Sequence, residues 1–213
     1  NNKIFALDPT LASINLGKKF SEENKINNVK FINADIFDDV FNNEVFDFIW
    51  TNGVLHHTKN PKLAFDIISK YLKKNGYILV GLYNRYGRIR TLIRRFLYKI
   101  FGKSIVMILD PTLRNIKKEN KEQIKSWIRD QYEHPVESLH TLDEVLHWFK
   151  KNNIKFINSI PKCTVEDQYS NSLFTKSSNG SIISRFFSQI SMLFNNLGSD
   201  GGLFVVIGKK KDK

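Results

Sequence analysis

The sequence predicts one α/β domain with a mostly parallel sheet flanked by helices. The chain has 213 residues, of which 41% are hydrophobic and 25% are charged, which is the composition of one globular domain. Short apolar segments alternate with amphipathic ones over residues 1–83. The connections between them are short, as they are where strands and helices build a parallel sheet.

Four strands and two helices are expected within residues 1–83. Each expected strand is a short apolar run that ends at polar residues. Pro61 favours a helix start, and Asn75 with Gly76 favours a helix end, because these residues suit the conformations at helix termini. The expected strands are 3–7, 29–34, 46–50 and 77–83, and the expected helices run from about 10 to 24 and from 61 to 76.

The rest of the chain is expected to hold a helical insertion and the last strands of the sheet. Thr141 and Glu144 form a capping box, which predicts a helix over about 142–151. We therefore expect one domain over residues 1–213, with a core at 1–83, a helical insertion at 84–153 and a C-terminal part at 154–213. Within the last part we expect a strand at 154–160, a polar loop at 164–181, a helix at 182–197 and a strand at 203–207.

The net charge of +12 comes from scattered lysines and one dense group of arginines. Five of the eight arginines lie between positions 85 and 95, and residues 85–103 hold seven basic residues and no acid. Apolar residues recur there at spacings of three and four, which predicts an amphipathic helix with a basic face. Three interpretations stay open: a basic side in solvent, a lid that grips an anionic substrate, and docking on an anionic membrane.

The cysteine count and the lengths of the apolar runs limit where in the cell the protein is expected and which partners it is expected to bind. Cys163 is the single cysteine, which excludes an internal disulfide and fits a reducing compartment, so we expect a cytoplasmic protein. No uncharged apolar run is long enough to span a membrane, which leaves peripheral contact at its inner face as an alternative. The basic segment lacks the aromatic and glycine signatures of RNA-binding modules, which argues against nucleic acid. The sequence indicates no particular oligomeric state.

Polar residues follow three of the expected strands: Asp8, Asp35 and residues 51–53. Ligands of parallel sheets bind where the carboxyl ends of the strands meet. Carboxylates at two neighbouring strand ends can accept hydrogen bonds from ribose hydroxyls and from an adenine amino group. The alternative is that they cap helices and turns, as such residues commonly do.

Four segments resemble, in their order and spacing, the class I, seven-stranded, Rossmann-like S-adenosylmethionine-dependent methyltransferases. They are ALDPT at 6–10, VKFINADIF at 29–37, FDFIWTNGVLHH at 46–57 and LKKNGY at 72–77. The resemblance implies S-adenosylmethionine as the cofactor and an antiparallel last strand at 203–207. It places the family's first strand and glycine-rich loop before Lys3, so we expect this Met-less sequence to be truncated and the first strand to be missing. The implied cofactor-binding residues are Asp8 and Pro9 near the ribose, Asp35, Ile36 and Phe37 at the adenine, and Asn52 and Gly53 at the methionine end.

Two histidines follow the third expected strand, at the end of the sheet where the cofactor would react. We predict His57 as a general base, because an imidazole titrates near neutrality; the alternative is that it caps a turn or packs under the insertion. His134, Glu137 and His140 are spaced by three, but Pro135 interrupts a helix there, so we predict no metal site. The candidate substrate-binding residues are His56, Tyr83, Arg85, Arg88, Tyr132, His134 and His140.

These observations predict methyl transfer from S-adenosylmethionine to an oxygen, carbon or nitrogen atom of a small-molecule or lipid-like acceptor. No Asp/Asn-Pro-Pro-aromatic run follows the third strand, which argues against the branch that methylates amino groups of nucleic acids. The alternative is a non-catalytic binding or scaffold protein on a degenerate or truncated methyltransferase fold. Such a protein would dock to an anionic surface through the basic segment 85–103.

Overall fold

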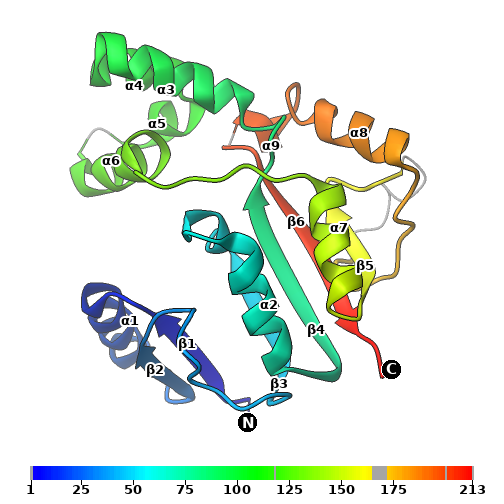
Figure 1. Cartoon of the computed structure of the whole chain (residues 1–213). Coiled ribbons are helices and arrows are strands. Elements are labelled where there is room, and N and C mark those ends of the chain that lie inside the picture. Colours follow the sequence, from blue (N-terminus) through cyan, green and yellow to red (C-terminus); the bar gives the residue numbers. More distant parts are fainter. Residues whose placement is uncertain (1, 118, 165–171, 200, 213) are drawn as a thin grey trace.

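The strands of this computed structural model form two sheets (Figure 1). The structure describes residues 2–117, 119–164, 172–199 and 201–212. β1 (Ile4–Asp8) and β2 (Val29–Asn33) pair in parallel as one sheet. The second sheet has the order β3 (Phe46–Asn52), β4 (Leu72–Tyr83), β6 (Leu203–Lys210) and β5 (Ile154–Ile160). Here β6 runs antiparallel to β4 and to β5, while β3 and β4 are parallel, which confirms the predicted fold class and the antiparallel last strand.

β1 and β3 do not pair with each other. The two sheets are instead in contact through aromatic side chains. The ring centroid of Phe5, on β1, lies 5.6 Å from that of Phe46, on β3, and 5.8 Å from that of Phe41. Phe41 in turn packs edge to face on Tyr71 at the end of α2. Edge-to-face ring pairs of this kind stabilise a contact beyond the area they bury.

The helices cover the four-stranded sheet and build the insertion. The main core lies between this sheet and two helices, and includes Phe65, Trp148, Phe149 and Phe204. The insertion has a separate core, which includes Val106, Ile124 and Tyr132. The helices are α1 (Leu11–Glu23), η1 (Leu55–His57), α2 (Pro61–Tyr71), α3 (Ile89–Phe101), α4 (Lys103–Leu109), α5 (Pro111–Asn115), α6 (Lys121–Ile128), the π-helical turn η2 (Arg129–Glu133), α7 (Leu142–Lys151), α8 (Ile182–Ser191) and α9 (Asn196–Ser199).

Local capping signals fix two helix starts as the sequence predicts. The backbone N–H of Glu144 donates to Thr141 Oγ1 over 3.2 Å, which confirms the cap of α7. In α2, Pro61 occupies the first turn and Asn60 caps the helix, with its Oδ1 accepting from the N–H of Leu63 over 3.0 Å. A side chain at the N-cap satisfies an amide that the helix itself leaves unpaired.

Two predicted boundaries are wrong. Asn75 and Gly76 do not end α2, because the helix stops at Tyr71 and the chain enters β4 at once. Asn75 is left-handed, with φ of 62°, where the pairing of β4 with β3 shifts register. The helix expected over 182–197 ends at Ser191 and a separate turn, α9, follows. Residues 165–171 of the expected loop lie outside the described residues.

Gly202, just before β6, packs against the backbone at the start of the insertion. A pair of glycine substitutions tests this contact. Its φ is 74°, and a Cβ there would lie 2.5 Å from the backbone N of Arg88. Gly102 has a similar φ of 70°, but nothing lies within 4 Å of its would-be Cβ. We expect Gly202→Ala to lower the free energy of unfolding by roughly 1–3 kcal/mol more than Gly102→Ala, because only the Cβ at position 202 would clash with a neighbouring backbone. Urea denaturation of both variants measures the difference. Equal losses would contradict this packing.

Candidate active site

Asp8 lies at the carboxyl end of β1 and is half-buried. Its Oδ1 accepts hydrogen bonds from the backbone N–H of Thr10 over 2.8 Å and from Thr10 Oγ1 over 2.5 Å. The carboxylate therefore caps the turn into α1, a role that leaves its Oδ2 without a hydrogen bond among the described residues. Pro9, beside it, is exposed.

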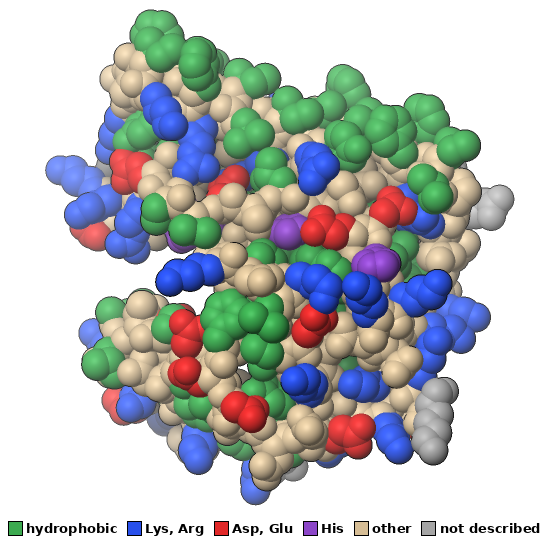
Figure 2. Space-filling view, viewed as in Figure 1, with side chains coloured by type: hydrophobic (Ala, Val, Ile, Leu, Met, Phe, Trp, Pro, Cys, Tyr) green, Lys and Arg blue, Asp and Glu red, His purple; other side chains and the backbone are tan. Residues whose placement is uncertain are grey.

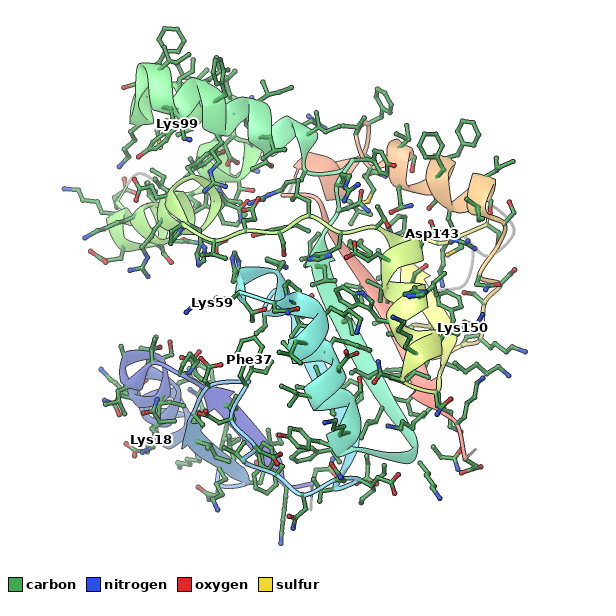
Figure 3. The ribbon with its side chains drawn as sticks, in the orientation of Figure 1. Lys18, Phe37, Lys59, Lys99, Asp143 and Lys150 are labelled. Atoms are coloured by element: carbon green, nitrogen blue, oxygen red, sulfur yellow. The ribbon has the colours of Figure 1, made fainter. Side chains whose placement is uncertain are left out.

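Asp35 lies just past the end of β2, at the same edge of the sheet. The backbone O of Asp8 accepts from the N–H of Ala34 over 3.3 Å, which holds the two strand ends together. Asp35 is exposed, and its Oδ1 accepts from the N–H of Phe37 over 3.0 Å. Ile36 and Phe37 pack against the main core, and Figure 3 shows Phe37 on the side of this loop that faces α2.

Asn52 and Gly53 lie at the carboxyl end of β3. Asn52 pairs with Gly81 of β4, and its Oδ1 fills the space where a side chain at Gly81 would lie. The N–H of Gly53 donates to the backbone O of Gly81 over 3.0 Å. Gly53 has a φ of 78° and no atom within 4 Å of its would-be Cβ, so its backbone faces open space.

A cluster of rings follows these residues at the ends of β3 and β4. His56 is fully buried, and its ring centroid lies 4.0 Å from that of Tyr83, the last residue of β4. The ring centroid of His57 lies 4.2 Å from that of His56 and 3.9 Å from that of His134. The fold thus brings together four of the residues that sequence analysis singled out.

The hydrogen bonds of this ring cluster define its protonation. The carbonyl of Val136 lies 3.0 Å from His57 Nδ1 and can only accept, so that nitrogen carries the proton. His57 Nε2 therefore accepts from His56 Nε2, 3.0 Å away. Both nitrogens of His57 are occupied, so the predicted base has no free lone pair in this arrangement. Burial lowers the pKa of His57, and burial together with the charges of His57 and Arg88 lowers that of His56 to about 2.

The buried neutral state of His56 makes stability depend on pH. Below pH 6.5 the unfolded chain protonates this imidazole, whereas the folded chain does not until about pH 2, so stability falls as pH falls through that window. We expect a loss of roughly 2 kcal/mol from this group between about pH 8 and about pH 5 in urea denaturation. His56→Asn should flatten the profile, and the exposed His147→Gln should leave it unchanged. A profile that His56→Asn does not alter would contradict this assignment.

Arg88 packs against the buried side of the ring cluster and does not face the solvent. Its guanidinium lies 3.6 Å from the centroid of the Tyr83 ring, and its side chain is fully buried. Nε donates to Glu137 Oε1 over 3.0 Å and Nη2 donates to Oε2 over 2.6 Å, while Nη1 donates to Gln131 and to the carbonyl of Gly201. The donors of Arg88, predicted as a substrate-binding residue, are therefore directed to Glu137, Gln131 and Gly201 within the fold.

Other predicted substrate residues lie apart from the ring cluster. Tyr132, predicted as a substrate-binding residue, is buried in the core of the insertion, where its hydroxyl donates to Asp110. His140 is buried with Nε2 2.8 Å from Ser138 Oγ. Arg85 is exposed, and its backbone N–H donates to the carbonyl of His140. Among the described residues, no group of three or more His, Cys, Asp and Glu could hold a metal ion.

Asp130 and Gln131 border the ring cluster, although sequence analysis assigned them no role. Gln131 Nε2 donates to Tyr83 Oη over 3.0 Å and to Asp130 Oδ2 over 2.6 Å. Asp130 is exposed, so its carboxylate is the negative charge next to the rings. The sequence indicates these two residues only through the polar composition of residues 130–140. No sequence pattern predicts the π-helical turn η2, which orients their side chains.

The sequence and the fold were compared with known proteins. Residues 1–153, well over half of the chain, match a family described as a methyltransferase domain. The structure of PKMT2 from Rickettsia typhi has a TM-score of 0.66 and 15% identity, over 99% of this chain and 44% of that one. A putative methyltransferase of Haloferax volcanii, solved in complex with the Trm112 methyltransferase activator, has a TM-score of 0.54 and 10% identity, over 98% of this chain and 72% of that one. No curated protein is similar enough in sequence to count as a relative.

The chain belongs to the methyltransferase domain family, and its fold is that of the class I S-adenosylmethionine-dependent methyltransferases. It spans less than half the length of the Rickettsia protein, which has also been solved in complex with AdoHcy. The strand ends fit S-adenosylmethionine, because Asp8 and Asp35 each keep one carboxylate oxygen that accepts no hydrogen bond from the described residues and could accept from hydroxyl or amino donors. Gly53 adds a stretch of backbone that a ligand can approach without meeting a side chain.

Proposed function

We propose that this chain transfers a methyl group from S-adenosylmethionine to an oxygen, nitrogen or carbon atom of a small-molecule or lipid-like acceptor. The observation that supports this acceptor class is the ring cluster at the ends of β3 and β4. Burial keeps the His56 imidazole uncharged, and the buried Arg88 is balanced by Glu137. The half-buried rings of His57 and His134, which lie over this buried pair of rings, favour an acceptor whose contact with them is largely apolar.

In this proposal the strand-end residues hold the cofactor. Asp8, with Pro9 beside it, accepts from the ribose hydroxyls, and Asp35 accepts from the adenine amino group. Ile36 and Phe37 offer apolar surface to the adenine ring, while Asn52 and Gly53 border the methionine end. The cofactor, when bound, supplies the reactive methyl group on a positively charged sulfur.

The ring cluster is proposed to position the acceptor. His57 gives its Nε2 lone pair to His56, so it can take a proton only after that hydrogen bond opens. Rate enhancement would then come mainly from holding acceptor and methyl donor in line, which can supply several kcal/mol of the barrier. His134 packs on the ring of His57 at the half-buried side of the cluster, where the acceptor would lie, and the buried Tyr83 supports His56 behind it.

The acceptor class can be tested without knowing the acceptor. The chain is incubated with methyl-tritiated S-adenosylmethionine and a cell extract separated into lipids, water-soluble small molecules, proteins and nucleic acids. We expect label in the lipid or small-molecule fraction, and a His57→Ala variant should lower it. Label only in protein or nucleic acid would overturn the proposed acceptor class, and a heat-denatured sample controls for transfer without the enzyme.

A further inference from the structure

Helix α3 attaches to the domain by its polar side and turns its apolar side outward. Thr91 and Arg94 are its buried residues. Arg94 Nη1 lies 3.6 Å from Asp110 Oδ1, and Arg95 Nε donates to the carbonyl of Tyr132 over 3.2 Å. The expected basic side therefore lies only partly in solvent, because Arg94 and Arg95 face the domain while Arg90 and Lys99 are exposed. The exposed apolar residues of α3 are Ile89, Leu92, Ile93, Phe96, Ile100 and Phe101.

Helix α8 has the same inverted arrangement. Its buried residues are Arg185 and Gln189. Arg185 Nη2 lies 2.6 Å from Asp143 Oδ1, and Gln189 Oε1 accepts from Asn84 Nδ2 over 2.9 Å. Its exposed apolar residues are Ile182, Ile183, Phe186 and Phe187, and Phe194, just beyond the helix, is 83% exposed.

The two helices lie along one edge of the molecule although 80 residues, 102–181, lie between them in sequence. The ring centroid of Tyr86, just before α3, lies 5.5 Å from that of Phe186, and Arg90 Nη1 donates to the carbonyl of Leu193 over 3.3 Å. Figure 2 shows hydrophobic side chains gathered along this edge, over α3, α4 and α8. We call this set of exposed side chains the apolar edge. Contiguous exposed apolar surface of this kind marks a site of protein or membrane interaction.

The two segments that carry the apolar edge have charge of one sign, although Asp143 and Glu133 of neighbouring elements contact α8 and α3. Residues 85–109 contain seven basic residues and no acid, and residues 172–199 contain Lys176 and Arg185 and no acid. Of these, Arg90, Lys99 and Lys103 are exposed on α3 and α4. Apolar and aromatic side chains bordered by lysine and arginine are typical of helices that lie in the interface of an anionic bilayer.

We propose that the apolar edge docks this protein on the surface of an anionic lipid bilayer, with α3, α4 and α8 parallel to the membrane. Among the described residues, no helix has the length and apolarity to cross a bilayer, so the contact is peripheral. A second copy of the chain fits this edge less well, because it would bring the exposed Arg90, Lys99 and Lys103 of both copies together. This inference does not depend on methyl transfer.

Vesicle sedimentation tests the proposal with the whole chain and no cofactor. We expect the chain to sediment with vesicles of equal parts phosphatidylglycerol and phosphatidylcholine, and binding should fall steeply as salt rises. The double variant Phe96→Ser with Phe187→Ser should bind at least tenfold more weakly, because both rings, 63% and 64% exposed, leave water on docking. A matched control, Leu16→Ser with Phe20→Ser, changes exposed apolar residues of α1 and should bind as the wild type does.

Several results would overturn the proposal. They are failure of the wild type to sediment, equal binding to pure phosphatidylcholine vesicles, and equal loss in the α1 control. A dimer in sedimentation velocity that Phe96→Ser with Phe187→Ser dissociates would instead assign the apolar edge to a second copy. All four substituted positions are exposed, so thermal melts of both variants should match the wild type and show that binding losses do not come from unfolding.

Discussion

Asp8→Asn is expected to weaken binding of S-adenosylhomocysteine by roughly ten- to a hundredfold, because a hydrogen bond to a charged group contributes about 1.5–3 kcal/mol. The substitution keeps Oδ1, which accepts from the N–H and Oγ1 of Thr10, so the turn that leads into α1 should survive. Isothermal titration calorimetry measures the affinity, and a thermal melt measures the stability. We expect the melt to change little.

Asp47→Asn is the matched control for this substitution. Asp47 lies at the opposite end of β3, and its side chain is 86% exposed beside Lys73. A surface pair of this kind contributes little, so both affinity and stability should stay close to those of the wild type. Equal loss of affinity in the two variants, or a loss of stability in Asp8→Asn that accounts for the loss of affinity, would exclude Asp8 as a cofactor ligand.

The core of the fold could be predicted because its signals are local. Short apolar strands ending at polar residues, and the cap formed by Thr141 and Glu144, each depend on residues close together in the sequence. The end of α2 could not be predicted this way. A left-handed Asn75 suits the end of a helix and a register shift equally well, and the pairing of Leu72 with Phe46 selects the second.

The orientation of α3 shows why much of the site could not be predicted. Its periodicity predicts an amphipathic helix but does not say which side is buried. Acidic partners determine which side of α3 is buried. Asp110 pairs with Arg94, and Glu137, 49 residues further along the chain, pairs with Arg88. A sequence shows a cluster of arginines, whereas the fold shows that these two already have partners. The same limit applies to His57, whose nitrogens are occupied by groups that only the fold brings near.

Arg88→Met is expected to lower the free energy of unfolding by about 3 kcal/mol, because the buried Glu137 loses both hydrogen bonds from the Arg88 guanidinium and keeps only the longer contact with Arg95, whose Nη1 lies 3.5 Å from Oε2. The Glu137 side chain is only 5% exposed, so water cannot replace the guanidinium. Glu137→Gln should destabilise for the same reason. The matched control, Arg114→Met, removes an exposed arginine of α5 and should change stability by less than about 0.5 kcal/mol. Urea denaturation measures all three, and a small effect of Arg88→Met would show that the pair is not buried in solution.

The double variant Arg88→Met with Glu137→Leu separates stability from function. Replacing both charges with apolar groups removes the buried unpaired charge, so much of the lost stability should return. The contact of the guanidinium with the Tyr83 ring and its hydrogen bond to Gln131 do not return. If this pair positions the ring cluster, methyl transfer should stay low in the double variant while its affinity for S-adenosylhomocysteine matches the wild type. If the pair only stabilises the fold, activity should recover together with stability, and Tyr83 would then owe its position to packing on His56.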